Sequence, residues 1–261
     1  EELDDARVFF HQGKLWLLYR NGPAFDYTRQ VQNPLHFQVT SPEGNLQVYI
    51  KSSESIVSCC GRNMALISSS SKKLQLLTWV DPLTVDEFDG TKFNAAPPAL
   101  QPQQPNKKAQ NAPNSHIHGT NGYMVPIPDS DNELLGIAHF HRPHKRTTSK
   151  YALHGHHYTH AFYTIKEDSN GRYQLTRLSN EFVFRSQSPS LHSGDVVVDA
   201  DIIQFASGLD IVGGGKHVLI SYGINDCEGA AFFVGLDRVL ALLGDYLPND
   251  KQVVDFMATI K

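Results

Sequence analysis

The chain has 261 residues, with 23 Lys and Arg against 27 Asp and Glu and a formal net charge of −4. A length of this order is typical of one domain or at most two and is sufficient for a full hydrophobic core. The mild acidity argues against a nucleic-acid partner, because such binding depends on Lys and Arg that neutralise phosphates. The sequence contains no run of 18 or more apolar residues, so we expect a soluble segment with no membrane partner. The cytoplasm and the lumen of the secretory pathway both stay open as compartments.

Short apolar runs of period two, separated by Gly, Ser, Asn or Asp, predict strands joined as hairpins. We predict five of them: residues 6–10 with 14–19, 64–68 with 74–80, 123–127 with 134–141, 161–166 with 173–178, and 202–205 with 217–222. One short helix is predicted near the end, before Gly244, from the spacing of Leu236, Val239, Leu240, Leu242 and Leu243. An almost all-β protein of this kind is a sandwich, a barrel or a propeller, and the long connections between hairpins favour the propeller.

One stretch, at about residues 89–114, is rich in Pro, Gln, Asn and Lys. Such a composition buries too little apolar surface to order itself, so we expect a flexible surface insertion. Strand patterns of the same kind resume on both sides of it. We therefore expect a single domain over residues 1–261.

Acidic and basic residues gather at the ends of the first predicted hairpin. Asp4, Asp5 and Arg7 come at the start of its first strand, and Arg20 comes at the end of its second strand. An acid beside an arginine places a proton donor and an anion-binding group at one rim, and two guanidinium groups suit a phosphate or a carboxylate. The alternative interpretation is a charged strand end at the surface.

Nine of the 13 histidines lie between residues 116 and 160. Alternate residues of a strand share a face, so His139 and His141 are expected to lie together, as are His156, Tyr158 and His160. Three interpretations stay open: a polar cleft that binds a sugar or phosphate, histidines satisfied inside the fold, and a metal site. No His-Glu-x-x-His spacing is present, and we expect no metal.

A buried strand pattern runs into a polar turn late in the chain. Tyr222 and Gly223 are followed there by Asn225, Asp226 and Glu228. This cluster is either a set of sugar-binding side chains or an ordinary polar turn.

Together these motifs resemble the inverting β-mannoside phosphorylases and the related β-1,2-mannosyltransferases, a five-bladed β-propeller family that also contains hydrolases. Residues 4–7 are similar to the family's Glu-Asp-Pro-Arg, Arg62-Asn63 to its Lys-Asn, Arg142 with its neighbouring histidines to its basic cluster, and residues 222–226 to its Tyr-Gly-x-x-Asp. The resemblance implies a five-bladed propeller with a short C-terminal helix. Relatives carry further blades before the acid motif, so we expect a propeller that is truncated at its N-terminus or closes its ring differently.

The resemblance implies a carbohydrate-active enzyme that makes or breaks β-mannosidic linkages by inverting transfer to or from phosphate, as a glycoside phosphorylase or a mannosyltransferase. Asp5 would be the general acid. Inorganic phosphate or a sugar-1-phosphate, with an oligosaccharide, would be the substrates, without a further cofactor. The residues implied to bind phosphate are Arg7, Arg20, Arg62, His141, Arg142 and Tyr158, and those implied to bind sugar are Asn63, His157, His160, Tyr222, Asp226 and Glu228.

This chemistry is physically coherent. Phosphate is itself the nucleophile in an inverting phosphorolysis, so one protonated carboxyl suffices and no second carboxylate base is needed. A cationic pocket binds the dianion and stabilises the charge as it moves.

Two other functions stay open at this point. A glycoside hydrolase of the same fold would need a base to activate water, for which Glu181, Asp226 and Glu228 are available. A propeller that binds sugar without catalysis would need neither acid nor base. The sugar, the linkage, the acceptor and the oligomeric state are not indicated by the sequence.

Overall fold

The computed structural model describes the backbone of residues 3–11, 14–21, 29–32, 35–39, 46–50, 55–58, 63–68, 74–81, 83–88, 93–95, 119–120, 124–142, 157–184, 203–224, 228–245 and 253–255. Side chains are described for residues 63–67, 74–81, 83–88, 94, 124–140, 158–184, 203–224 and 228–244.

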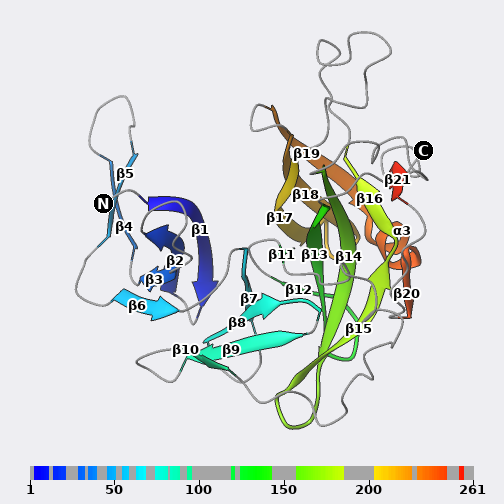
Figure 1. The fold of residues 1–261 in the computed structure, drawn as a ribbon, viewed down its shortest axis with the longest axis horizontal. Helices are drawn as coiled ribbons and strands as arrows, with labels where there is room; N and C mark the ends of the chain where they lie inside the picture. The colour runs from blue at the N-terminus through cyan, green and yellow to red at the C-terminus, as the bar shows by residue number, and fades with distance from the viewer. Residues whose placement is uncertain are drawn as a thin grey trace.

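The first half of the chain forms two four-stranded antiparallel sheets (Figure 1). The first sheet has the order β1-β2-β3-β6, from β1 (Leu3–His11), β2 (Lys14–Asn21), β3 (Arg29–Gln32) and β6 (Ser55–Ser58). The second has the order β10-β9-β8-β7, from β7 (Ala65–Ser68), β8 (Leu74–Trp79), β9 (Thr84–Phe88) and β10 (Phe93–Ala95). A separate hairpin is formed by β4 (Leu35–Val39) and β5 (Leu46–Ile50).

The second half forms a large third sheet and a smaller fourth sheet. The third has the order β11-β13-β14-β15-β20, from β11 (Gly119–Thr120), β13 (Glu133–Arg142), β14 (His157–Glu167), β15 (Tyr173–Ser179) and β20 (Leu243–Asp245). It is extended by β12 (Val125–Pro126), β16 (Glu181–Val183) and β21 (Val253–Asp255). The fourth is β17 (Gln204–Val212), β18 (His217–Ile224) and β19 (Glu228–Gly235), followed by the helix α3 (Leu236–Ala241).

All five predicted hairpins are present as antiparallel pairs: β1 with β2, β7 with β8, β12 with β13, β14 with β15, and β17 with β18. In the fifth, the first strand runs from Gln204 to Val212 and takes in most of the predicted loop. Successive sheets also touch in chain order, because β10 contacts β6, β11 contacts β8, and β13 and β14 contact β17. Small antiparallel sheets that follow one another in this way are typical of propeller blades. No strand pairing among the described residues closes the sheets into a ring, so the five-bladed ring stays a prediction.

The third sheet lies between the second and the fourth, and each of its faces belongs to a different hydrophobic core. Side chains alternate between the faces of a strand. On β13, Leu135 and Ile137 therefore pack toward the fourth sheet, whereas Leu134 and Ala138 pack toward the second. The core on the fourth-sheet side also holds Phe162, Phe182, Phe184, Leu209, Val218, Ile220 and Val239.

Gly136 shows how closely the core on the second-sheet side is packed. A Cβ atom at this position would lie 2.6 Å from Met124 Sδ and 2.6 Å from Tyr163 Cζ. The hydroxyl of Tyr163 donates a hydrogen bond of 2.9 Å to the same sulfur. The Tyr163 ring therefore occupies space that a side chain at residue 136 would fill.

The predicted C-terminal helix is present, but it is shorter than its apolar spacing indicates. The side chains of Leu236 and Val239 are buried. Leu242 lies at the C-cap, where its N–H binds the carbonyl oxygen of Val239 at 3.1 Å. Leu243 then pairs with Ser179 as part of β20, so the end of the helical pattern is a strand added to the third sheet.

The predicted insertion at about residues 89–114 begins differently from expectation. Phe93–Ala95 form β10 and pair with β9. Residues 89–92 and 96–114 lie outside the described residues.

Two further features concern the surface of the described part. The outer face of the fourth sheet exposes Phe233, with 55% of its surface accessible, next to Leu219 on the neighbouring strand. The Phe233 ring stacks on His217 with the centroids 4.6 Å apart. Among the described residues, no helix has the length and apolar character needed to cross a membrane.

Candidate functional site

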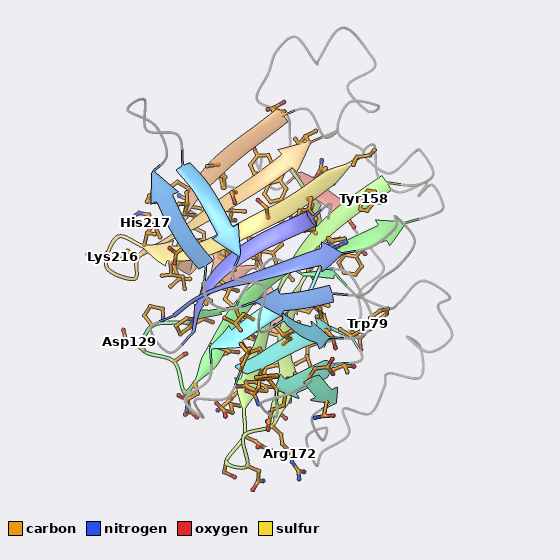
Figure 2. The ribbon with its side chains drawn as sticks, turned by 90° about the vertical axis from the view of Figure 1, so that its left-hand side faces the viewer. Trp79, Asp129, Tyr158, Arg172, Lys216 and His217 are labelled. Carbon is orange, nitrogen blue, oxygen red and sulfur yellow. The ribbon has the colours of Figure 1, made fainter. Side chains whose placement is uncertain are left out.

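The histidine-rich strands of the third sheet meet in a register that brings the predicted site residues together. His139 lies opposite His160, His141 opposite Tyr158, and Arg142 opposite His157. For His141, Arg142 and His157 the structure describes the backbone only. These residues lie where β13 ends and β14 begins. Figure 2 shows Tyr158 and Asp129 at opposite ends of this sheet.

Four side chains from three different sheets converge at this end, and we call them the three-sheet cluster: Asn63, His139, Tyr158 and Phe205. The amide Nδ2 of Asn63 lies 3.4 Å from Nε2 of His139. The His139 ring has its centroid 5.3 Å from that of Phe205, edge to face, and 6.2 Å from that of Tyr158. Asn63, Tyr158 and Phe205 are half-buried, whereas His139 is buried. The segment that leads into the second sheet therefore meets the third and fourth sheets at one polar and aromatic site.

Asn63 reaches this site from an unusual backbone conformation. Its φ is +60°, in the left-handed region, which Asn tolerates better than most residues other than Gly. Such conformations cluster at functional sites. Asn63 immediately precedes Met64, the buried residue that leads into β7.

His160 is placed inside the core and not at an exposed surface. Its exposed fraction is 0%, and its ring contacts Phe182 and Phe184 at centroid distances of 5.9 and 5.0 Å. The backbone N–H of Ala206 donates to its Nε2 at 3.1 Å, so the neutral ring carries its proton on Nδ1. Burial disfavours the charged form and lowers the pKa of His160 to about 3. We expected this residue to bind sugar, but its contacts make it a link between β14 and β17.

Tyr222, also expected to bind sugar, lies in the same core. It is buried, and its ring stacks on Phe184 with the centroids 4.2 Å apart. Glu228 begins β19 opposite Ile224 and is half-buried. Arg62 and Asp226 lie outside the described residues.

Asp5, the candidate acid, lies at an irregularity of the first sheet. Asp4 pairs with Arg20 and Arg7 pairs with Leu18, so the register shifts between Asp4 and Arg7. The strand β1 has one residue more than β2 in this interval, which is the pattern of a β-bulge. Bulges redirect side chains and are frequent next to active sites. The pairing also brings the backbone of Arg20 directly opposite that of Asp4.

Two buried polar contacts involve chain neighbours of the three-sheet cluster, Gln204 next to Phe205 and Thr159 next to Tyr158. Gln204 accepts a hydrogen bond from the N–H of Phe184 at 2.8 Å and donates one to the carbonyl oxygen of the same residue at 2.6 Å. Glu181, considered above as a base for hydrolysis, is 4% exposed and accepts a hydrogen bond of 2.5 Å from Thr159. This contact gives the Glu181 carboxylate a structural role within the third sheet.

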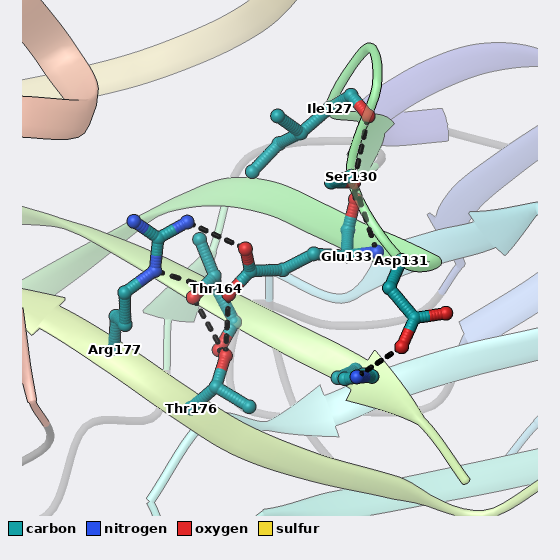
Figure 3. Close-up of polar contacts among 8 residues, drawn as sticks. Ile127, Ser130, Asp131, Glu133, Thr164, Thr176 and Arg177 are labelled. Carbon is teal, nitrogen blue, oxygen red and sulfur yellow. Dashed lines mark hydrogen bonds and ion pairs between the residues drawn. The ribbon is translucent and has the colours of Figure 1, made fainter.

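A second polar cluster lies at the opposite end of β13 (Figure 3). We call it the turn cluster, and it consists of Glu133, Thr164, Thr176 and Arg177. Glu133 accepts hydrogen bonds from Arg177 at 3.1 and 2.5 Å and from the hydroxyl of Thr176 at 2.8 Å. Burial alone would raise the pKa of Glu133, but the hydrogen bonds from Arg177, Thr164 and Thr176 lower it below its usual value. A carboxylate held in this way is a poor proton donor, so the turn cluster is structural.

The described residues contain no group of three or more His, Cys, Asp or Glu side chains that could hold a metal ion. Phe205 and Gln204 were not among the site residues expected from the sequence. The contact of His139 with Asn63 was not expected either. Phe205 lies inside the predicted strand at residues 202–205, but nothing in the sequence indicates its contact with a residue 66 positions earlier.

No protein-family model and no curated protein matches this chain. Among solved structures it is similar to a glycosyl hydrolase from Bacteroides ovatus, at 10% identity and a TM-score of 0.49, over 90% of this chain and 66% of that one. This chain therefore spans just under two thirds of the length of that protein.

Two arabinanases are also similar in structure. One is a GH43 endo-arabinanase from Bacillus licheniformis, at 10% identity and a TM-score of 0.35, over 95% of this chain and 74% of that one. The other is an exo-1,5-alpha-L-arabinanase from a bovine ruminal metagenomic library, at 11% identity and a TM-score of 0.39, over 88% and 72%. With TM-scores below 0.5, these similarities assign neither a family nor an activity to this chain.

Proposed function

We propose that the chain belongs to a carbohydrate-active enzyme that transfers a mannosyl group to or from phosphate with inversion. The observation that carries the proposal is the register shift of β1 at Asp5, which coincides with the position of the acid in the resemblance described above. The pairing of Asp4 with Arg20 supports it, since it brings an arginine position to the same end of the hairpin.

In the phosphorolytic direction, an oxygen of phosphate attacks the anomeric carbon of the sugar as the glycosidic bond breaks. The proton of Asp5 passes to the departing glycosidic oxygen, directly or through a substrate hydroxyl, and the other product is a sugar-1-phosphate of inverted configuration. The phosphate supplies the nucleophile, so Asp5 is the only carboxyl the step requires. The synthetic direction reverses each of these transfers.

Cationic side chains would hold the phosphate through these steps. The expected groups are Arg7, Arg20, Arg62, His141 and Arg142, with the hydroxyl of Tyr158. The ladder of the third sheet supports this grouping, because it puts His141 beside Tyr158 and Arg142 beside His157. Guanidinium groups bind phosphate in a bidentate manner and also stabilise the charge that moves during transfer.

The deciding experiment is release of inorganic phosphate from mannose-1-phosphate in the presence of mannose and mannooligosaccharide acceptors. We expect release that depends on the acceptor, and a loss of roughly 100-fold or more in Asp5→Asn, because general acid catalysis is worth that much. Asp4→Asn is the matched control, since Asp4 is the neighbouring acid with a regular ladder partner. It should keep activity within a few-fold.

The outcomes separate the three functions. Equal activity in wild type and Asp5→Asn would contradict the role of Asp5. Sugar release from mannooligosaccharides that is independent of phosphate would establish a hydrolase, with Glu228 the first base to test because it is half-buried at the start of β19. Sugar binding without turnover in either direction would establish a non-catalytic propeller.

A further inference from the structure

Phe205 is the member of the three-sheet cluster that comes from the fourth sheet, on β17. Its ring lies against the buried His139 in an edge-to-face arrangement with a centroid distance of 5.3 Å. The ring is half-buried, unlike those of Phe162, Phe182 and Phe184 in the adjoining core. Phe205 is therefore an aromatic side chain at the border between the core and the surface.

The neighbours of Phe205 along the chain hold its backbone on both sides. Gln204 makes two hydrogen bonds with the backbone of Phe184, and the N–H of Ala206 binds the buried ring of His160. His160 belongs to β14 and Phe184 directly follows β16, so the start of β17 is tied to the third sheet before any ligand arrives. An aromatic ring positioned in this way binds a ligand at a low entropic cost.

Polar groups are positioned beside the rings from the other two sheets. Asn63 presents its amide from a left-handed backbone conformation and contacts His139, and the ring of Tyr158, from β14, lies 6.2 Å from that of His139 between centroids. A few oriented polar groups beside aromatic surface are the usual composition of a small-ligand site. The arrangement fits a ligand with both an apolar face and hydroxyl groups, which describes a pyranose ring.

We propose that Phe205 and Tyr158 form a stacking subsite for one sugar ring of the substrate, and that the Asn63 amide binds a hydroxyl of the same ring. The C–H groups on one face of a pyranose meet the negative face of an aromatic ring. His139 contacts both rings and Asn63. The inference rests on the proposed carbohydrate activity and adds the subsite and the residues that define it.

The test is equilibrium binding of β-1,2-linked and β-1,4-linked mannotriose, measured by calorimetry in the Asp5→Asn protein so that no turnover occurs. We expect Phe205→Leu to weaken binding about tenfold, because it keeps apolar volume but removes the aromatic face. Phe205→Tyr keeps the ring and should bind within about twofold of the parent protein. Far-UV circular dichroism and thermal unfolding establish that each variant is folded.

Phe233→Leu is the matched control, since it makes the same change on the same sheet at an exposed ring outside the cluster. It should leave binding unchanged. Equal affinity of the parent protein and folded Phe205→Leu would overturn the subsite, as would equal weakening by Phe233→Leu.

A separate readout distinguishes failure of the subsite from failure of the proposed function. If the protein with native Asp5 turns over mannose-1-phosphate but Phe205→Leu binds mannotriose normally, the function stands and the subsite is wrong. If turnover is absent but binding depends on Phe205 as expected, the subsite stands and the catalytic proposal is wrong. If the Asp5→Asn protein does not bind mannotriose and the protein with native Asp5 does not turn over mannose-1-phosphate, both are wrong.

Discussion

The two ends of the β13–β14 hairpin use polar side chains in opposite ways. At the turn cluster, the charges of Glu133 and Arg177 are satisfied within the third sheet itself. At the other end, His139 and His160 make their contacts with the second and fourth sheets, through Asn63 and Ala206 respectively. Polar groups that a sheet satisfies internally stabilise that sheet, whereas those that reach other sheets determine how the sheets meet.

The difference also separates structure from candidate chemistry within one element. The Glu133 carboxylate accepts hydrogen bonds from Arg177 and Thr176, which leaves it little capacity for a ligand. The three-sheet cluster combines half-buried rings with an amide in a left-handed conformation, which suits contact with a ligand. Mutations at the two ends should therefore change different properties.

The largest effect on stability is expected at His160. His160→Ala removes a fully buried ring and leaves the N–H of Ala206 without its acceptor, which should cost about 3 kcal/mol in the free energy of unfolding. Urea denaturation measures this loss. His160→Gln keeps an acceptor and should lose less, and a loss in His160→Ala below about 1 kcal/mol would show that the ring does not join the sheets.

The second effect is a dependence of stability on pH at the histidine end. Burial lowers the pKa of His160 from 6.5 to about 3, so between these values the unfolded chain binds a proton that the folded protein does not. Stability therefore falls as the pH is lowered from 6.5 toward 3, by roughly 1.4 kcal/mol per pH unit from this group. The measurement is the urea midpoint at pH 7 and pH 5.

Two variants assign that dependence to the imidazole. His160→Gln should show a shallower loss between pH 7 and pH 5 than the wild type. Val239→Ala disturbs the same core from α3 without removing the imidazole, so it should lower stability at both pH values and keep the wild-type difference between them. Identical pH dependence in wild type and His160→Gln would contradict the assignment.

A smaller effect is expected at the turn cluster. Glu133→Gln removes the charge that Arg177 contacts, and the two side chains are 17% and 29% exposed, so the loss should be about 1 kcal/mol at pH 7. Because the pKa of Glu133 is lowered in the folded protein, its contribution is present above the usual value of 4.5 and is lost as the pH falls below it. A comparison of unfolding curves at pH 7 and pH 3.5 checks both statements, and a wild-type advantage as large at pH 3.5 as at pH 7 would contradict them.

The smallest effect is expected at Asp131. Its carboxylate lies 2.6 Å from Nζ of Lys166, but its side chain is 82% exposed, and exposed ion pairs contribute little because water and salt screen them. Asp131→Asn should leave the thermal midpoint unchanged within error. A fall in the thermal midpoint as large as that of Glu133→Gln would show that Asp131 and the turn cluster form one network.

Much of the local structure could be predicted from the sequence. The five hairpins follow from alternating apolar residues and from turns rich in Gly, Asn and Asp. The approximate place of α3 follows from Leu236 and Val239, whose side chains are buried. The helix stop was missed, because Leu243 is apolar in either conformation and the pairing with Ser179 that makes it a strand is a tertiary contact.

The site could be predicted only in outline. The period of two put His139 and His141 together on one strand and His156, Tyr158 and His160 together on the next. The observed register joins these two strands with His139 opposite His160 and His141 opposite Tyr158. The burial of His160 depends on Phe182, Phe184 and Ala206, which come 22 to 46 residues later. Alternation along a strand does not indicate which sheet will cover a face, so sequence reasoning placed His160 with the ligand.

The position of the third sheet between two cores has a consequence for how the molecule opens. The amide hydrogens of β13 and β14 are covered on one face by residues such as Ala65 and Leu77 and on the other by Leu209 and Ile220. Loss of either neighbouring sheet leaves these strands packed on one side. Their amides should therefore exchange with solvent more slowly than those of β9 or β19, and the central hairpin would be the last part of the described structure to unfold.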